Sequence, residues 1–372
     1  MKVFFYVQHL LGIGHLKRAA TLAQGLRGAG FQVVLVSGGA PVSGITVDVQ
    51  LAPASAADMT FKTLLDDSGR PVDEAWKRAR AAALLDVWRA LRGEVLLIEL
   101  FPFGRRQMRF ELMPLLEDAR RLTPRPLVVC SVRDLLQPRP DREQETADLA
   151  LRFFDRILVH GDPRLASFEL TFGAARALEG RLHYTGYVVA PVAPPAAMGS
   201  EVLVSAGGGA VGKRLLETAI AAREQTLLRG SPWRLFAGIN CSEADFRELG
   251  RLAKAGIVIE RSRADFQELL ASCALSVSQA GYNTVMEIVR AGARAVVVPF
   301  AGGHETEQSL RARCFAERGL LEVVEEPVLA PETLAAAIDR AAQRPRGSRG
   351  SINLDGARRS AALVAELAMG KN

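Results

Sequence analysis

The sequence has few cysteines, and none of them is spaced as a metal ligand. Its four cysteines are scattered and form no Cys-x-x-Cys motif; they are Cys130, Cys241, Cys273 and Cys314. Each lies beside apolar residues, so we expect reduced thiols that fill the core rather than a disulfide, a metal site or a catalytic thiol. Reduced thiols are typical of a cytoplasmic protein, and this is the location we expect.

Long hydrophobic runs are absent as well. No apolar run approaches the roughly 20 residues that cross a membrane. The N-terminal MKVFFYVQHLLGIGH has a short apolar run but no small-residue cleavage site after it. A strand followed by a glycine loop explains this stretch better than a signal peptide.

Several catalytic and binding motifs are also missing. The chain has no Walker A, HExxH or GxSxG motif and no kinase set, and it has no Asp-x-Asp pair of the kind that holds a metal and a diphosphate. Aromatic residues make up 6% of the chain, and no basic run is interleaved with them, so we expect no nucleic-acid partner. The net charge of +6 fits either a phosphorylated substrate or simply arginine-rich, solvated helices.

What the chain does contain is a regular alternation of short apolar strands and helical stretches. At 372 residues it is long for one core and predicts two domains. Strand, glycine loop, helix and strand follow one another from residue 2 to residue 37, and the same order resumes at residue 202. We predict an α/β protein with two doubly wound, Rossmann-like domains that face a cleft. The domains span residues 1–188 and 201–372, with a proline-rich linker at 189–200.

One stretch, residues 278–308, is the most informative. In SQAGYNTVMEIVRAG, Gly281 is expected to make a sharp turn through positive φ, and Asn283 and Thr284 to cap a helix that stops at Gly292. A helix N-terminus of this kind suits a phosphate. Glu287, one turn further, is placed to accept two ribose hydroxyls. A structural explanation, a capped helix and a buried strand, remains the alternative.

The stretch continues into a strand and a polar loop. The strand is predicted at 295–300, and the loop after it carries Glu305, Glu307 and Gln308, which are suited to bind sugar hydroxyls. A second glycine loop in the same domain, with Gly207, Gly208 and Gly209, lets the backbone approach an anion. Together these segments predict a nucleotide-sugar site, although a tight turn alone would also explain the glycines.

The N-terminal domain has a matching loop between its first strand and first helix. Gly12 and Gly14 lead into His15, which would stand at a helix N-terminus, where the dipole keeps it neutral and able to accept a proton. A structural histidine is the alternative. Lys17 and Arg18 are suited to an acceptor phosphate, or they form a solvated helix face.

These three segments resemble those of one enzyme family. GIGHLKRAATLAQGL, SAGGGAVGKRLLE and SQAGYNTVMEIVRAGARAVVVPF…ETEQ resemble the two glycine loops and the donor motif of GT-B glycosyltransferases, in the branch that includes the peptidoglycan N-acetylglucosaminyltransferases. The resemblance is spread over the whole chain, and the donor motif is its most specific part. It also implies that the last helix, near 356–369, packs back on the N-terminal domain.

The resemblance implies a role for each matching residue. Gly207 to Gly209, Asn283 and Thr284 would hold the diphosphate, Glu287 the ribose, and Glu307 and Gln308 the sugar, while the loop around Arg263 would meet the base through backbone groups. His15 would lie near the reaction centre. Two departures stand out: the first loop reads Gly-Ile-Gly-His, and the sugar pair reads Glu-Gln, which adds a negative charge.

The predicted function is therefore sugar transfer from a nucleoside-diphosphate sugar, expected to be a UDP-sugar, to an acceptor hydroxyl. We expect inversion without a metal or other cofactor, with His15 as base and Glu99 and Asp134 as reserve candidates. A nucleotide-sugar 2-epimerase and a non-catalytic nucleotide-sugar binder are the alternatives. The acceptor and the oligomeric state are not readable. Residues 98–116 mix basic and apolar residues, which fits either an amphipathic helix or contact with a lipid-linked acceptor at the inner membrane surface.

Overall fold

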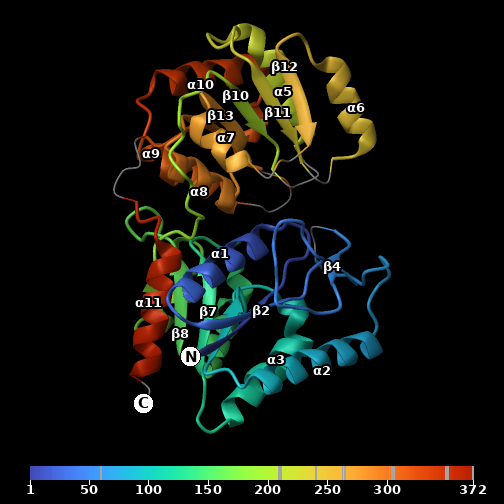
Figure 1. Ribbon diagram of the computed structural model, residues 1–372, viewed down its shortest axis with the longest axis vertical. Coiled ribbons are helices and arrows are strands. Elements are labelled where there is room, and N and C mark those ends of the chain that lie inside the picture. The colour runs from blue at the N-terminus through green and yellow to red at the C-terminus, as the bar shows by residue number, and fades with distance from the viewer. Residues whose placement is uncertain are drawn as a thin grey trace. The chain divides into compact units, whose positions relative to one another are not determined.

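The chain forms two compact units, each a parallel sheet covered by helices (Figure 1). The computed structural model describes residues 1–58, 61–207, 212–238, 241–261, 263, 265–300, 302, 306–347 and 352–370. Unit 1 comprises Met1–Val188 and Asn353–Asn372, and unit 2 comprises Val189–Ile352. The predicted pair of Rossmann-like domains is therefore confirmed.

The sheet of unit 1 has seven strands in the order β3-β2-β1-β6-β7-β8-β9, and all neighbours pair in parallel. The strands are β1 (Lys2–Val7), β2 (Gln32–Ser37), β3 (Val49–Gln50), β6 (Val95–Glu99), β7 (Leu127–Arg133), β8 (Arg156–His160) and β9 (Leu182–Tyr184). The helices are α1 (Gly14–Gly28), α2 (Glu74–Leu91), α3 (Arg109–Arg121), α4 (Glu143–Phe153) and α11 (Gly356–Met369).

Alternation along the strands creates two cores, one on each face of this sheet. In β1, Val3 and Phe5 pack with α1 and α11, whereas Phe4 and Tyr6 pack with α2 and α3. Both faces are buried, as expected for a parallel sheet between helices. The helix α11 packs on α1, and the Gly356 N–H donates to the Tyr187 carbonyl at 3.0 Å, so the C-terminal segment belongs to unit 1.

Unit 2 repeats the design with six parallel strands in the order β12-β11-β10-β13-β14-β15. The strands are β10 (Val202–Ser205), β11 (Trp233–Ala237), β12 (Ile257–Arg261), β13 (Leu275–Gln279), β14 (Ala295–Val298) and β15 (Glu322–Val323). The helices are α5 (Lys213–Ala222), α6 (Glu243–Leu252), α7 (Phe266–Ser272), α8 (Tyr282–Ala291), α9 (Glu307–Glu317) and α10 (Pro331–Gln343).

The strand order of each sheet reverses once, and this fixes where ligands bind. In unit 1 the chain leaves β1 toward β2 on one side and returns to β6 on the other; in unit 2 the same happens between β10 and β13. Loops that leave two such strands diverge and leave a crevice at their carboxyl ends. The loop after β1 and the end of β6 therefore meet in unit 1, and Gly207 meets the end of β13 in unit 2.

The structure differs from the sequence prediction mainly at short elements. The strands β3 and β9 and a small antiparallel pair, β4 (Ser55–Ala56) with β5 (Leu64–Leu65), were not predicted. Two- and three-residue strands carry too little periodicity to be recognised. Helix α3 starts at Arg109, directly after a 3₁₀ turn at Arg106–Met108.

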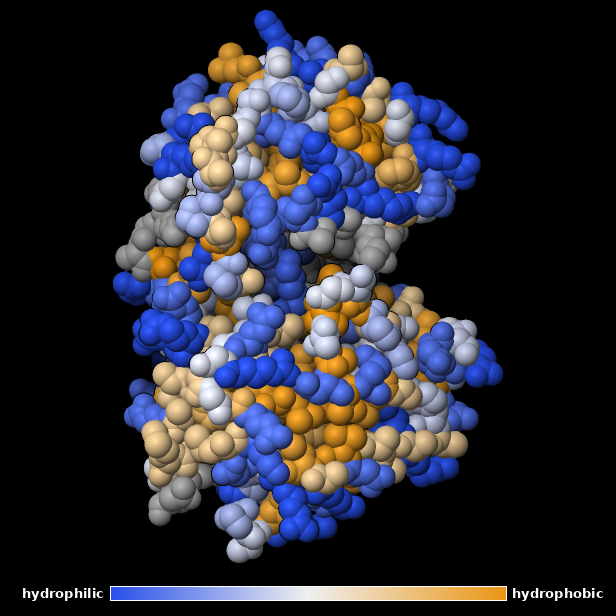
Figure 2. All heavy atoms as spheres, viewed as in Figure 1, coloured by the Kyte–Doolittle hydropathy of each residue, from blue (hydrophilic) through white to orange (hydrophobic). Residues whose placement is uncertain are grey.

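Cysteine placement agrees only in part with the expectation of core thiols. All four are free; Cys130 and Cys273 are buried, whereas Cys241 and Cys314 are partly exposed. Among the described residues, no helix is both long enough and apolar enough to cross a membrane. Hydrophilic and hydrophobic residues are interspersed over the face drawn in Figure 2.

A buried ion pair ties α2 and α3 to the sheet of unit 1. Arg80 Nε lies 2.9 Å from Glu111 Oε2, and neither side chain has exposed surface. Arg80 also donates to Gln8 Oε1 at 2.8 Å, and the Tyr6 hydroxyl donates to Glu111. Burial raises the pKa of Glu111, against the opposing charge of Arg80. Each charge is tolerated here because the other is present.

Replacing one partner of this pair should therefore be costly. Arg80→Met leaves the carboxyl of Glu111 buried without its counter-ion, and we expect a loss of about 3–5 kcal/mol in the free energy of unfolding, measured by urea titration. Arg89→Met on the same helix is the matched control, because Arg89 pairs with Asp118 at the surface and should cost about 0–1 kcal/mol. Equal losses in the two variants would contradict this account.

A second buried polar group, His160, stands at the end of β8. Its Nε2 lies 2.7 Å from Ser131 Oγ and its Nδ1 lies 2.9 Å from Thr185 Oγ1, and the residue has no exposed surface. Burial lowers the pKa of His160 to about 3, and the positive charge of Arg18 adds to this effect. The ring is therefore neutral in the folded protein at neutral pH.

This neutrality predicts acid sensitivity. The unfolded chain binds a proton at this histidine below its ordinary pKa of about 6.5, whereas the folded chain binds it only near pH 3, so stability falls as the pH decreases through this window. His160→Gln should reduce the slope of unfolding free energy against pH between 6 and 4 by up to about 1.4 kcal/mol per unit. An unchanged slope in chemical denaturation at several pH values would refute the assignment.

Candidate active site

In unit 1, His15 and Glu99 meet at the point where the strand order reverses. His15 is the second residue of α1, directly after the loop that leaves β1, and Glu99 is the last residue of β6, the neighbour of β1. His15 Nδ1 lies 2.9 Å from Glu99 Oε1, and Arg18, one turn along α1, donates to the same oxygen. The side chain of Glu99 has no exposed surface, whereas that of His15 is 15% exposed.

The charges in this cluster fix the state of each group. Burial opposes ionisation of Glu99, but His15 and Arg18 outweigh it and lower the pKa of the carboxyl to about 2. Burial lowers the pKa of His15 to about 3, against the opposing charge of Glu99. A neutral His15 whose Nδ1–H donates to a carboxylate presents the lone pair of Nε2, and this is the form that accepts a proton.

The two reserve candidates for the base do not fit that role. Glu99 is buried and already bonded to His15 and Arg18, so it orients the imidazole instead of reaching a substrate. Asp134 is also fully buried, and its carboxylate accepts the Leu135 N–H at 2.8 Å. Two glycines precede His15 in the loop after β1. Gly12 is exposed and faces open space, and Gly14 is the first residue of α1.

In unit 2, the glycine loop and the end of β13 lie side by side. Gly207 follows β10 with φ of 66°, a conformation that favours glycine, and its N–H donates to Ser205 Oγ at 3.3 Å. A Cβ added at Gly207 would lie 3.6 Å from Gln279 Oε1, which places the loop next to the last residue of β13. Gly208 and Gly209, predicted to hold the diphosphate, lie outside the described residues.

The helix α8 begins differently from the prediction. Gly281 is its N-cap, but φ is −62°, so the glycine does not make a turn through positive φ. Asn283 and Thr284 lie in the first turn rather than at the cap, and no side chain caps this end. The C-terminus matches the prediction, because Gly292 has φ of 60°. A helix N-terminus without a side-chain cap has backbone N–H groups that can donate to an anion.

Glu287 lies one turn into α8 and is 7% exposed. Gln267, on α7, donates from Nε2 to Glu287 Oε1 at 3.0 Å. This partner could not be predicted from the sequence, because no spacing rule links the two helices. The amide holds the carboxylate in one orientation, which suits a group that must accept ribose hydroxyls.

Glu307, the first residue of α9, is 4% exposed and does not stand as an uncompensated charge. Arg311 Nη1 lies 3.7 Å from Glu307 Oε1, and the guanidinium of Arg311 lies 5.4 Å from the ring centroid of Tyr282 on α8. The charge expected from the Glu-Gln pair is therefore balanced by an arginine that the sequence analysis did not single out. Its i, i+4 spacing from Glu307 was a readable signal.

The last two predicted donor residues have partners within unit 2. Gln308 Oε1 accepts the Phe300 N–H at 3.2 Å, which ties α9 to the chain after β14. The Arg263 guanidinium forms two bonds to Asp265, at 2.8 and 2.7 Å. This side chain is therefore held within its own loop. Glu305 lies outside the described residues.

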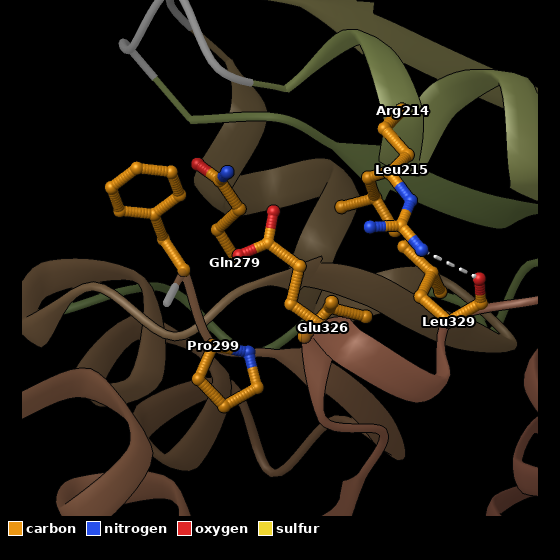
Figure 3. Close-up of a pocket in the computed structure, with 8 residues that line it drawn as sticks. Arg214, Leu215, Gln279, Pro299, Glu326 and Leu329 are labelled. Carbon is orange, nitrogen blue, oxygen red and sulfur yellow. Dashed lines mark hydrogen bonds between the residues drawn. The ribbon is translucent and has the colours of Figure 1, made fainter. Parts of the chain in front are cut away.

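Unit 2 has a small cavity between α5 and the ends of β13 and β14 (Figure 3). Its volume is about 10 Å³, enough for one water molecule and too small for a sugar. Gln279 and Glu326 point toward it, and Arg214 of α5 donates to the Leu329 carbonyl at 3.2 Å. Because its lining comes from α5 and the ends of β13 and β14, the cavity shows how these elements are joined and is not the donor pocket itself.

Among the described donor residues, Gly207 follows β10, and Asn283 and Thr284 lie in the helix after β13, at the carboxyl edge of the sheet of unit 2. His15 follows β1 at the carboxyl edge of the sheet of unit 1. Within the described part of the chain, no three His, Cys, Asp or Glu residues gather closely enough to hold a metal ion. The partner of His15 was within reach of sequence reasoning, since the ends of β1 and β6 flank the reversal of strand order.

Comparisons with known proteins identify glycosyltransferases as similar in sequence and in fold. Residues 242–354 match the glycosyltransferase family 28 C-terminal domain. A relative from Granulibacter bethesdensis is 30% identical over 135 residues, which cover 35% of each chain, and one from Phenylobacterium zucineum is 27% identical over 191 residues, which cover 49% of this chain and 52% of the relative. Both are named UDP-N-acetylglucosamine--N-acetylmuramyl-(pentapeptide) pyrophosphoryl-undecaprenol N-acetylglucosamine transferase. The matches thus span a third to a half of these relatives.

Solved structures match over nearly the whole chain. Acinetobacter baumannii MurG superimposes with a TM-score of 0.62 at 16% identity, covering 98% of this chain and all of that one. The glycosyltransferase VinC, in complex with dTDP, has a TM-score of 0.62 at 17% identity with full coverage of both. The chain therefore has the GT-B fold, and it resembles the glycosyltransferases of the branch that includes the peptidoglycan N-acetylglucosaminyltransferases.

Proposed function

We propose that this protein is a glycosyltransferase that moves a sugar from a nucleoside-diphosphate sugar, expected to be a UDP-sugar, to an acceptor hydroxyl. The observation that carries the proposal is the donor edge of unit 2. There, Gly207 and the first turn of α8 lie on either side of the strand reversal, with Glu287 one turn away. The family 28 match over residues 242–354 covers this motif and supports the assignment.

In this proposal the donor diphosphate lies against the glycine loop and the N-terminus of α8. Backbone N–H groups and the helix dipole stabilise the negative charge that develops on the leaving group. The ribose hydroxyls donate to Glu287, and the sugar contacts Glu307 and Gln308. Stabilisation by the helix end makes a metal ion unnecessary, so metal independence is part of the proposal.

The acceptor is assigned to unit 1, where His15 acts as general base. Glu99 holds the imidazole through Nδ1, and Nε2 takes the proton of the attacking hydroxyl. Direct attack on the anomeric carbon inverts its configuration. The relatives named above are described as acting on an undecaprenol-linked substrate, and we propose a lipid-linked acceptor here, with the protein cytoplasmic and peripheral to the inner membrane.

The role of Glu287 in donor binding can be tested by substitution. Glu287→Gln keeps the shape of the side chain but loses its charge, so the affinity for UDP should fall about tenfold, as expected for a lost hydrogen bond to a charged group. The preference for UDP over 2′-deoxy-UDP should shrink with it, as measured by calorimetry. Gln267→Ala should reduce the same preference by releasing the carboxylate, whereas Gln225→Ala, at the surface of unit 2, should not. An undiminished preference in Glu287→Gln would contradict the ribose assignment.

The role of His15 as general base can be tested in the same way. His15→Ala should lower kcat for sugar transfer by about 10²–10⁴-fold while the Kd for UDP stays unchanged. Because the pKa of His15 is near 3, the base is deprotonated throughout the neutral range, and kcat/KM should show no acidic limb between pH 5 and 7. His183→Ala, in the same unit, is the control and should keep full turnover.

Turnover and UDP-binding measurements also separate the alternative functions. Incubation with donor alone detects an epimerase, because epimerisation needs no acceptor. A nucleotide-sugar binder would bind UDP without turnover of any acceptor. Full transferase turnover in His15→Ala would refute the base assignment.

A further inference from the structure

The segment between β6 and α3 holds an unusual backbone conformation. Leu100 and Arg105 both have positive φ, 68° and 60°, which few residues other than glycine adopt. Between them, the Gly104 N–H donates to the Leu100 carbonyl at 3.1 Å, and a Cβ at Gly104 would lie 2.6 Å from a Leu100 methyl group. Such strain costs about 1–3 kcal/mol per residue and persists where the surrounding structure over-determines it. The turn fixes where the backbone of Arg105 lies.

That place is the edge of the sheet where the strand order reverses. Arg105 Nε donates to the Gln8 carbonyl, directly after β1, at 2.7 Å. The cluster of His15 and Glu99 lies at the same edge, and the charge of Arg105 reaches it, since Arg105 helps to lower the pKa of both groups. The guanidinium is therefore near enough to the proposed base to act on it electrostatically.

Among the described residues, no carboxylate lies within ion-pair distance of Arg105. Its neighbours in sequence differ: Arg106 and Arg109 each bind Glu145 at 2.7 Å on the surface. Burial lowers the pKa of Arg105 to about 10 in spite of the nearby charge of Glu99, and Arg133 adds to the effect. Glu99 is already bonded to His15 and Arg18, so it does not serve as the counter-ion of Arg105.

Arg105 is partly buried and has no adjacent carboxylate among the described residues, so an anion that docks on it would balance its charge. The planar guanidinium offers two parallel donors, which fit a phosphate or carboxylate group. We propose that Arg105 binds an oxyanion of the acceptor and so positions the reacting hydroxyl beside His15. The assignment of the anion to an acceptor rests on the proposed function, whereas the anion site at Arg105 does not.

The test is a calorimetric titration of the full-length protein with inorganic phosphate and, separately, with acetate, in the presence of saturating UDP. UDP occupies the donor site of unit 2, so the remaining binding reports on unit 1. We expect at least one anion to bind the wild type, and Arg105→Gln to weaken it tenfold or more. Arg105→Lys, which keeps the charge but loses the fork, should give an intermediate loss. Arg106→Gln is the matched control and should change the affinity less than twofold.

Three results would overturn the proposal. These are the absence of binding of either anion to the wild type, equal weakening by Arg105→Gln and Arg106→Gln, and anion binding that appears only when UDP is left out, which would locate the anion in the donor site. Thermal unfolding of each variant shows whether it is folded, and Arg105→Lys keeps the test decisive if the glutamine variant is not. Because the readout is binding, anion binding at Arg105 without transferase activity would refute the proposed function and leave the site standing.

Discussion

The carboxyl ends of two parallel sheets, at the point where the strand order reverses, are the constraint on which the rest of the structure depends. Neighbouring loops diverge there, backbone N–H groups of the following helices point outward, and a ligand can approach without displacing a hydrogen-bonded strand. In unit 1 this point brings His15 to Glu99. In unit 2 it brings Gly207 next to Gln279, the last residue of β13. The chemistry assigned to each residue follows from this position.

A second constraint is the burial of charge at these edges. Glu99 is held by Arg18 and Glu307 by Arg311, and in each case the arginine lies on the helix that begins at the site. A buried carboxylate needs such a partner to remain ionised. Burial keeps the nearby His15 neutral, against the opposing charge of Glu99. Among the described residues, Arg105 has no carboxylate within ion-pair distance, unlike Arg18 and Arg311. We therefore assign it to an external anion.

Much of the fold was readable from the sequence because the two periodicities are strong. The β1 and β10 strands and the last helix have the predicted bounds, and a glycine at position 292 ends α8 as expected. The hydrogen-bonding partners of side chains were harder to predict. Gln267 meets Glu287 across two helices with no sequence spacing to reveal it, and the role of Gly281 was misjudged because a glycine before a helix does not reveal its φ. Position was predictable from topology, whereas hydrogen-bonding partners required the packed structure.

The most direct test of the account is a crystal structure of the protein with bound UDP. The account predicts the diphosphate against Gly207 and the first turn of α8, with the ribose hydroxyls within hydrogen-bond distance of the Glu287 carboxylate. A diphosphate bound elsewhere, for example on Arg105 in unit 1, with the N-terminus of α8 empty, would contradict it.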